Sequence, residues 1–132
     1  MSIHPLVCAS LVLALGACAP GMESATDGDA RASSPRQCFQ ASLVRNFRAD
    51  GTGVVYVRAN DNTVYELNTG GCPGLDFTSS LVMTSDPPVG DRLCVGDHAR
   101  VTVPGSAAIC RARVSKALTA EEVAALPGNV RP

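Results

Sequence analysis

From Gly53 to Asn68 the chain reads GVVYVRANDNTVYELN, two runs of β-branched and aromatic residues separated by Asn60-Asp61-Asn62. Runs of this kind favour β-strands, and clustered Asn and Asp residues favour a turn between them. A third run, Ala41–Arg48, ends just before Asp50-Gly51, a dipeptide typical of hairpin turns. The three runs therefore predict an antiparallel meander of three strands, at 41–48, 53–59 and 63–68.

The chain after the meander predicts further strands at close spacing. Residues 75–83 predict a helical turn followed by a short strand, and Ser85–Asp91 (SDPPVGD) predicts a loop because consecutive prolines lack backbone donors. Arg92–Val95 and His98–Val103 flank Gly96-Asp97, so they predict a second hairpin.

Ile109–Lys116 predicts one more strand, whose alternate residues separate into an apolar and a polar face. The apolar face has Cys110, Ala112 and Val114, and the polar face has Arg111, Arg113 and Ser115.

A short helix is predicted at the end of the chain. Thr119 and Glu122 have the spacing of a capping box, and Pro127-Gly128 is a stop signal. Several short strands and one late helix predict a mainly β fold, a small antiparallel barrel or sandwich with a short C-terminal helix.

Composition limits the class of protein. The chain has 132 residues, 45% of them hydrophobic and only 4% aromatic, with a formal net charge of −1. This length suits one modest domain, and the charge argues against a nucleic-acid partner.

The N-terminus predicts export. Leu6–Ala17 is an apolar run of 12 residues, whereas a membrane-spanning helix needs about 20. The run ends in Leu15-Gly16-Ala17-Cys18, which resembles the lipobox of bacterial lipoproteins, so residues 1–17 are predicted to be a signal peptide and Cys18 the lipidated residue. The alternative is an ordinary secretory peptide cleaved near Ala19.

The residues after Cys18 predict the location and the anchor. Ala19 replaces the Asp that retains lipoproteins at the inner membrane, which favours the periplasmic side of the outer membrane. Apart from Met22, residues 19–36 are small, polar or charged, so residues 18–36 are predicted to be the lipidated Cys18 and a disordered tether that leads to a domain at 37–132.

Four cysteines remain in the predicted domain: Cys38, Cys72, Cys94 and Cys110. An even number in an exported domain predicts two disulfides, whereas a zinc site would normally show a CxxC pair. Sequence leaves three pairings open, of which we favour Cys72–Cys94 with Cys38–Cys110, because the first pair would constrain the irregular Pro/Gly-rich segment.

Signals for catalysis and for cofactors are weak. His98 is the single histidine after the signal peptide and is interpreted as an exposed strand residue rather than a catalytic base, since no GxSxG motif accompanies it. We therefore predict no catalytic residue, no metal and no cofactor. Arg111 and Arg113, with Arg45, form a candidate contact for an anion or a partner, but a solvated outer face is the favoured interpretation of these residues.

The order of several motifs resembles a family of small proteobacterial lipoproteins of unknown function. These motifs are Cys38-Phe39, Val44-Arg45-Asn46-Phe47, the strands Val55-Tyr56-Val57-Arg58 and Val64-Tyr65-Glu66-Leu67, Cys72-Pro73-Gly74-Leu75-Asp76-Phe77, Cys94, Cys110 and Leu118-Thr119-Ala120-Glu121-Glu122. The resemblance spans roughly 38–126. It implies an envelope location and two cystine bridges, and it assigns no catalytic residue.

Two functions follow as hypotheses. The first is a non-enzymatic binding or structural module, anchored to the membrane by lipid, that contacts an envelope protein or an anionic envelope component. The second is a small periplasmic enzyme with an unrecognised site.

Overall fold

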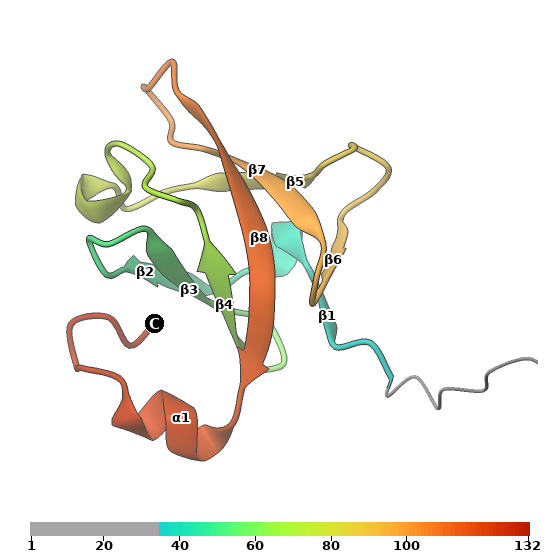
Figure 1. Ribbon diagram of the computed structural model, residues 1–132, viewed down its shortest axis with the longest axis vertical. Coiled ribbons are helices and arrows are strands. Elements are labelled where there is room, and N and C mark those ends of the chain that lie inside the picture. The colour runs from blue at the N-terminus through green and yellow to red at the C-terminus, as the bar shows by residue number, and fades with distance from the viewer. Residues whose placement is uncertain (1–34) are drawn as a thin grey trace, which may run out of the picture. The chain divides into compact units, whose positions relative to one another are not determined.

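Figure 1 shows the computed structural model, which describes residues 35–132; the predicted signal peptide, Cys18 and nearly all of the predicted tether lie outside these residues. The strands are β1 (Cys38–Gln40), β2 (Asn46–Ala49), β3 (Val54–Arg58), β4 (Val64–Asn68), β5 (Val82–Ser85), β6 (Arg92–Cys94), β7 (His98–Thr102) and β8 (Ile109–Leu118). The helices are two 3-10 turns, η1 (Ala41–Leu43) and η2 (Leu75–Phe77), and α1 (Ala120–Ala125).

All strand pairs in the described residues are antiparallel. Six strands form one sheet in the order β2-β3-β4-β8-β7-β5, which curves into a half-barrel, and β1 pairs with β6 in a second sheet (Figure 1). The predicted mainly β fold with a short C-terminal helix is confirmed.

The predicted meander is formed by β2, β3 and β4. Its register places Phe47 opposite Val57, and Val57 opposite Tyr65. At the first turn, Asp50 Oδ1 accepts hydrogen bonds from the amides of Thr52 and Val54, at 2.8 and 3.0 Å. The acidic side chain thereby closes the hairpin that the Asp50-Gly51 dipeptide predicts.

A glycine at this turn allows a close approach of the backbone. Gly53 has φ +105°, and a Cβ on it would lie 2.6 Å from the amide nitrogen of Gly71. The Gly53 carbonyl also accepts hydrogen bonds from the Thr69 amide and hydroxyl, at 2.7 and 2.8 Å. The hairpin tip is therefore tied to the loop after β4.

The first predicted strand is only half correct. Ala41–Leu43 forms η1, and β2 begins at Asn46 instead of Ala41. The reason is Asp91, whose carbonyl accepts from the Ala41 amide at 2.8 Å and whose carboxylate accepts from the Ser42 amide at 3.0 Å. These non-local bonds turn the chain where local preference favours extension.

The predicted hairpin of Arg92–Val95 with His98–Val103 is wrong. β6 pairs with β1, whereas β7 pairs with β8 and β5. The turn between them is bonded to β8: the Gly96 amide donates to the Val114 carbonyl at 2.8 Å, and the Val114 amide donates to the Asp97 carbonyl at 3.0 Å. The turn therefore sends the chain from one sheet to the other.

The long strand β8 shows the predicted alternation. Cys110, Ala112 and Val114 are buried, and Arg111, Arg113 and Ser115 are exposed. A bulge at Ser115 shifts the register between β4 and β8, so that Glu66 faces Lys116 while Leu67 faces Val114.

The core lies between the inner face of the six-stranded sheet and the β1–β6 pair. Phe39 on β1 and Leu93 on β6 pack with Tyr65, Leu67 and other buried residues of the larger sheet. The rings of Phe39 and Tyr65 have centroids 4.6 Å apart, and the Tyr65 hydroxyl donates to the Cys38 carbonyl at 3.0 Å. Tyrosine thus fills the core and also satisfies a backbone acceptor.

The C-terminal segment folds back on the outer face of β3 and β4. The predicted capping box of Thr119 and Glu122 begins α1. Beyond the helix, Arg58 donates two hydrogen bonds to the Pro132 carbonyl, at 2.6 and 2.8 Å, while Val130 is buried. Among residues 35–132, no helix has the length and apolar character needed to cross a bilayer.

Candidate functional site

All four cysteines of the described domain form disulfides, as predicted, but the preferred pairing is wrong. The bridges are Cys38–Cys94 and Cys72–Cys110, in place of Cys72–Cys94 and Cys38–Cys110. Cys38 and Cys94 face each other across β1 and β6, with Cα atoms 3.9 Å apart. Cys72 and Cys110 have Cα atoms 5.7 Å apart, and they join the loop after β4 to the start of β8.

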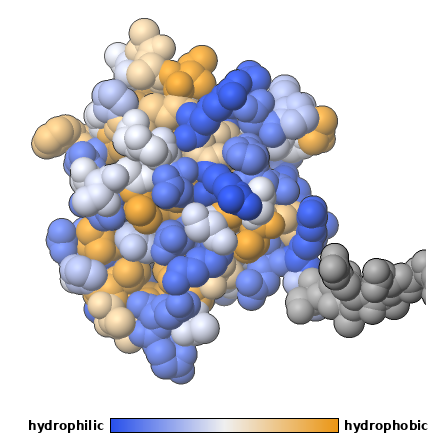
Figure 2. Space-filling view, in the orientation of Figure 1, coloured by the Kyte–Doolittle hydropathy of each residue, from blue (hydrophilic) through white to orange (hydrophobic). Residues whose placement is uncertain are grey.

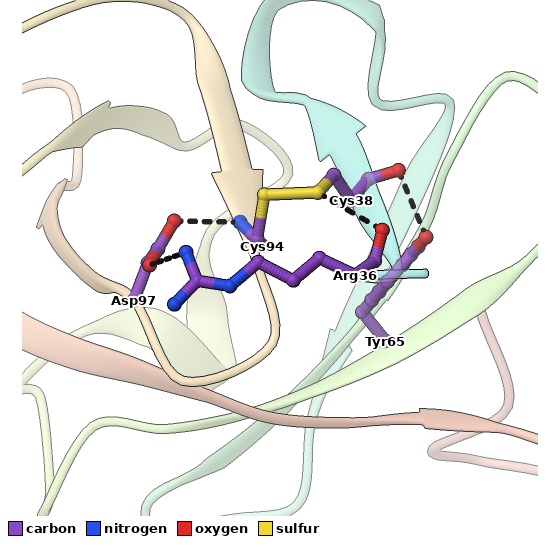
Figure 3. The surroundings of a disulfide bond; sticks show 5 residues. All are labelled: Arg36, Cys38, Tyr65, Cys94 and Asp97. Atoms are coloured by element: carbon purple, nitrogen blue, oxygen red, sulfur yellow. Dashed lines mark hydrogen bonds and ion pairs between the residues drawn. A yellow bond between two sulfur atoms is a disulfide. The ribbon is translucent and has the colours of Figure 1, made fainter. Parts of the chain in front are cut away.

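The residues around the Cys38–Cys94 bridge hold the backbone of the two cysteines in place (Figure 3). Asp97 Oδ2 accepts from the Cys94 amide at 2.9 Å, and Tyr65 holds the Cys38 carbonyl. Arg36 lies 4.0 Å from Asp97, and both side chains are substantially exposed. Since the sulfurs are bonded to each other and the carboxylate holds a turn, these residues fasten the small sheet.

A cluster of three arginines lies on the outer face of β7 and β8: Arg100, Arg111 and Arg113, called the arginine cluster below. Arg100 faces Arg111 directly across the strand pair, and Arg113 faces His98. Figure 2 shows strongly hydrophilic residues over these strands. The sequence predicted Arg111 and Arg113 as neighbours, and the structure adds Arg100 to them.

One acidic side chain, that of Asp86, forms ion pairs with two arginines of this cluster. Asp86 lies 3.0 Å from Arg100 Nη2 and 3.6 Å from Arg111 Nε, with its side chain only 17% exposed. Arg113 has no ion pair among the described residues. Like charges directly opposite on a sheet destabilise it, so one carboxylate leaves the cluster with an excess positive charge.

Arg45 does not join Arg111 and Arg113. It precedes β2, at the far edge of the six-stranded sheet, where its guanidinium donates to Asn62 Oδ1 at 3.5 Å. It lines a separate cleft.

This cleft, of about 420 Å³, is bordered by η1, the start of β2 and the residues leading into β5. Its apolar lining includes Val44, Phe47, Leu81 and Met83. At its rim the Ser42 hydroxyl donates to the Asp91 carboxylate. This carboxylate also accepts a hydrogen bond from the Ser42 amide, and it therefore holds η1 in place.

His98 lies away from the cleft. It is exposed on β7, as predicted, and is not one of the residues that line either cavity described here. The second cavity, of about 240 Å³, lies beside the Cys72 loop and the β2–β3 turn. Within residues 35–132 no three His, Cys, Asp or Glu side chains are placed to hold a metal ion.

Sequence reasoning missed Arg100 and Asp86. Alternation along His98–Thr102 places Arg100 on the polar face of its strand, which was a usable signal. The sequence does not show that this strand pairs with β8. The predicted hairpin paired it with Arg92–Val95, so Arg100 was not placed beside Arg111.

Comparison with known proteins places the chain in a family. A family model, described as a family of unknown function (DUF6491), matches residues 1–128. No curated protein matches the chain, and no solved structure matches it.

Proposed function

We propose a function from the residues themselves, because the chain belongs to DUF6491, a family of unknown function. The protein is an envelope lipoprotein, anchored through Cys18 on the periplasmic side of the outer membrane. Its β-domain is a non-enzymatic binding module for an anionic envelope component.

The anchor is supported by the N-terminal sequence. An apolar run of 12 residues leads to Leu15-Gly16-Ala17-Cys18, with small residues where a lipoprotein signal peptidase requires them. Several acyl chains on one cysteine hold a protein firmly, since each buried methylene contributes about 0.8 kcal/mol.

The arginine cluster is the observation that carries the binding role. Three guanidinium groups gather on adjacent strands of a chain whose net charge is −1, and only two of them, those of Arg100 and Arg111, pair with a carboxylate, that of Asp86. Arginine presents a planar fork of donors that suits carboxylate and phosphate oxygens. An anion bound there neutralises the positive charge of the cluster that Asp86 leaves uncompensated.

The test of the binding role is crosslinking in cells followed by pull-down of the full chain. Arg111→Glu with Arg113→Glu is expected to lose the partners that the unaltered protein captures, because both charges reverse on the contact face. Arg45→Glu with Arg92→Glu makes the same change in net charge at other places and is expected to retain them. Equal capture by both variants would remove the cluster from the binding site.

The anchor is tested separately. Cys18→Ser is expected to yield soluble or unprocessed protein that incorporates no radiolabelled palmitate, because the lipid acceptor is gone. Continued incorporation of palmitate would show that another residue carries the lipid.

The enzyme hypothesis has a test in the cleft. Ser42 and Asp91 are its only hydroxyl–carboxylate hydrogen-bonded pair among the described residues. Ser42→Ala is expected to preserve the phenotype of the gene in a protein that remains folded and anchored. Loss of the phenotype in such a protein would favour a catalytic role over a binding module.

A further inference from the structure

A row of exposed aliphatic side chains adjoins the arginine cluster on the same face. Ile109 on β8 and Val82 on β5 both face Thr102 of the strand between them, β7. The two residues are 67% and 52% exposed. They form the aliphatic row of this face.

The register places the aliphatic row beside the arginines. Arg111 lies two residues after Ile109, Arg100 two before Thr102, and Thr84 two after Val82. Residues two apart on a strand project from the same face and are separated by roughly 7 Å. Apolar and cationic side chains therefore stand side by side on one open surface, in the region of β7 and β8 (Figure 2).

We infer that this face rests on an anionic membrane surface. The guanidinium groups bind the phosphates of lipid headgroups, while Ile109 and Val82 reach the boundary of the acyl chains. This inference rests on the proposed binding role of the arginine cluster, and it names the partner as lipid.

The chemistry of the face favours lipid over a protein. Protein interfaces usually depend on buried aromatic anchors that fill a pocket in the partner. The rows described here have arginine, threonine and single aliphatic residues. Arg100, Arg111, Arg113 and Ile109 line neither cavity, and of this face only Val82 borders the cleft of about 420 Å³. Diffuse attraction and shallow apolar insertion are sufficient at a membrane surface.

Asp86 acts as an internal competitor for the headgroups. Its carboxylate already occupies the space between Arg100 and Arg111, at 3.0 and 3.6 Å from them. Each basic residue near an anionic membrane contributes about fivefold to binding. Asp86→Asn is thus expected to raise the ratio of docked to undocked domain by about fivefold or more.

The chain has no tryptophan, so a single introduced indole reports its position. The full chain purified from the envelope, with Ile109→Trp, is placed in vesicles that contain brominated lipids. Vesicles rich in phosphatidylglycerol are expected to quench the indole, and vesicles of phosphatidylcholine are not. Val82→Trp provides a second reporter in the same row.

Three controls separate docking from mere tethering. Phe77→Trp reports from η2, which packs against the opposite edge strand β2. Phe77 itself is 94% exposed, and an indole at this position is expected to stay unquenched. Arg111→Glu with Arg113→Glu is expected to lower the docked ratio about 25-fold or more, since two charges are removed and reversed. Salt at about 1 M is expected to do the same by screening.

The outcomes separate this inference from the proposed function. Quenching at position 109 that is absent, or equal to that at position 77, overturns membrane docking. If the double arginine variant still loses its partners in cells, the binding face stands, and its ligand is an acidic protein or polymer instead of lipid. If the variant affects neither quenching nor capture, both proposals fail.

Discussion

Asp50, Asp91 and Asp97 each accept a hydrogen bond from a backbone amide at a change of chain direction. Asp50 closes the β2–β3 turn, Asp91 holds η1, and Asp97 holds the end of β6. A carboxylate is a strong acceptor for amides that no strand satisfies, which explains why short polar side chains direct this fold.

Asp50 is expected to make stability depend on pH. Partial burial raises the pKa of its carboxyl, but hydrogen bonds from the Thr52 hydroxyl and from the Thr52 and Val54 amides outweigh burial and hold the pKa below its ordinary value of 3.8. A lowered pKa in the folded state means that the carboxylate stabilises the fold above about pH 3.8. This contribution is lost as the pH falls through the lower folded value.

The corresponding variant is Asp50→Ala. At neutral pH it is expected to lower the free energy of unfolding by about 1–2 kcal/mol, because amides at the turn lose their acceptor. The difference in the free energy of unfolding between the variant and the unaltered protein should shrink as the pH falls through the pKa of Asp50 in the folded state. Urea titrations at neutral pH and at acidic pH would measure this change. Asp76→Ala removes an acidic side chain in η2 that accepts no hydrogen bond from the described residues, and it serves as the control; an equal effect there would contradict the turn mechanism.

At the scale of elements, the unexpected partner of β6 decides how the two sheets are joined. β6 pairs with β1 and not with its sequence neighbour β7. The Cys38–Cys94 bridge joins these two strands, whereas Cys72–Cys110 joins the loop after β4 to β8. The sequence separations of the bridges are 56 and 38 residues. Loops of this length give about 4 kcal/mol of stabilisation each in the chain-entropy model.

Peptide mapping checks the pairing directly, because trypsin leaves each cysteine on its own peptide: 37–45, 59–92, 93–100 and 101–111. Without reductant, 37–45 is expected to be linked to 93–100, and 59–92 to 101–111. Alkylation before reduction should modify none of these four cysteines. A link between 59–92 and 93–100 would restore the nested pairing and contradict the fold of β6.

At the scale of the whole molecule, the C-terminal segment completes the domain from outside the sheet. Val64 of β4 is only 1% exposed. It lies opposite Arg58 of β3, whose guanidinium donates a hydrogen bond to the Pro132 carbonyl. Val130 is buried in the same closing segment. The half-barrel therefore has a second apolar contact besides its main core.

Val130→Asp tests this contact. The substitution places a charge at a buried position, so the segment is expected to detach. The free energy of unfolding is expected to fall by about 1.5–3 kcal/mol, because the apolar contact of Val130 is lost. Thermal unfolding measures the loss. Asn129→Asp adds the same charge at the exposed neighbouring position and should leave the midpoint nearly unchanged; similar midpoints for both variants would exclude a packing role for Val130.

The sequence by itself determined the features that depend on neighbouring residues: the β2–β4 meander, the alternation along β8, the capping box of α1 and the use of four cysteines in bridges. Periodicity, turn chemistry and capping act over a few residues, so they can be read along the chain. Only the tertiary structure decided that β6 pairs with β1, that Cys38 meets Cys94, and that Arg100 joins Arg111 while Arg45 does not. Those pairings depend on contacts between distant segments, and local preference is the same whichever partner a strand finds.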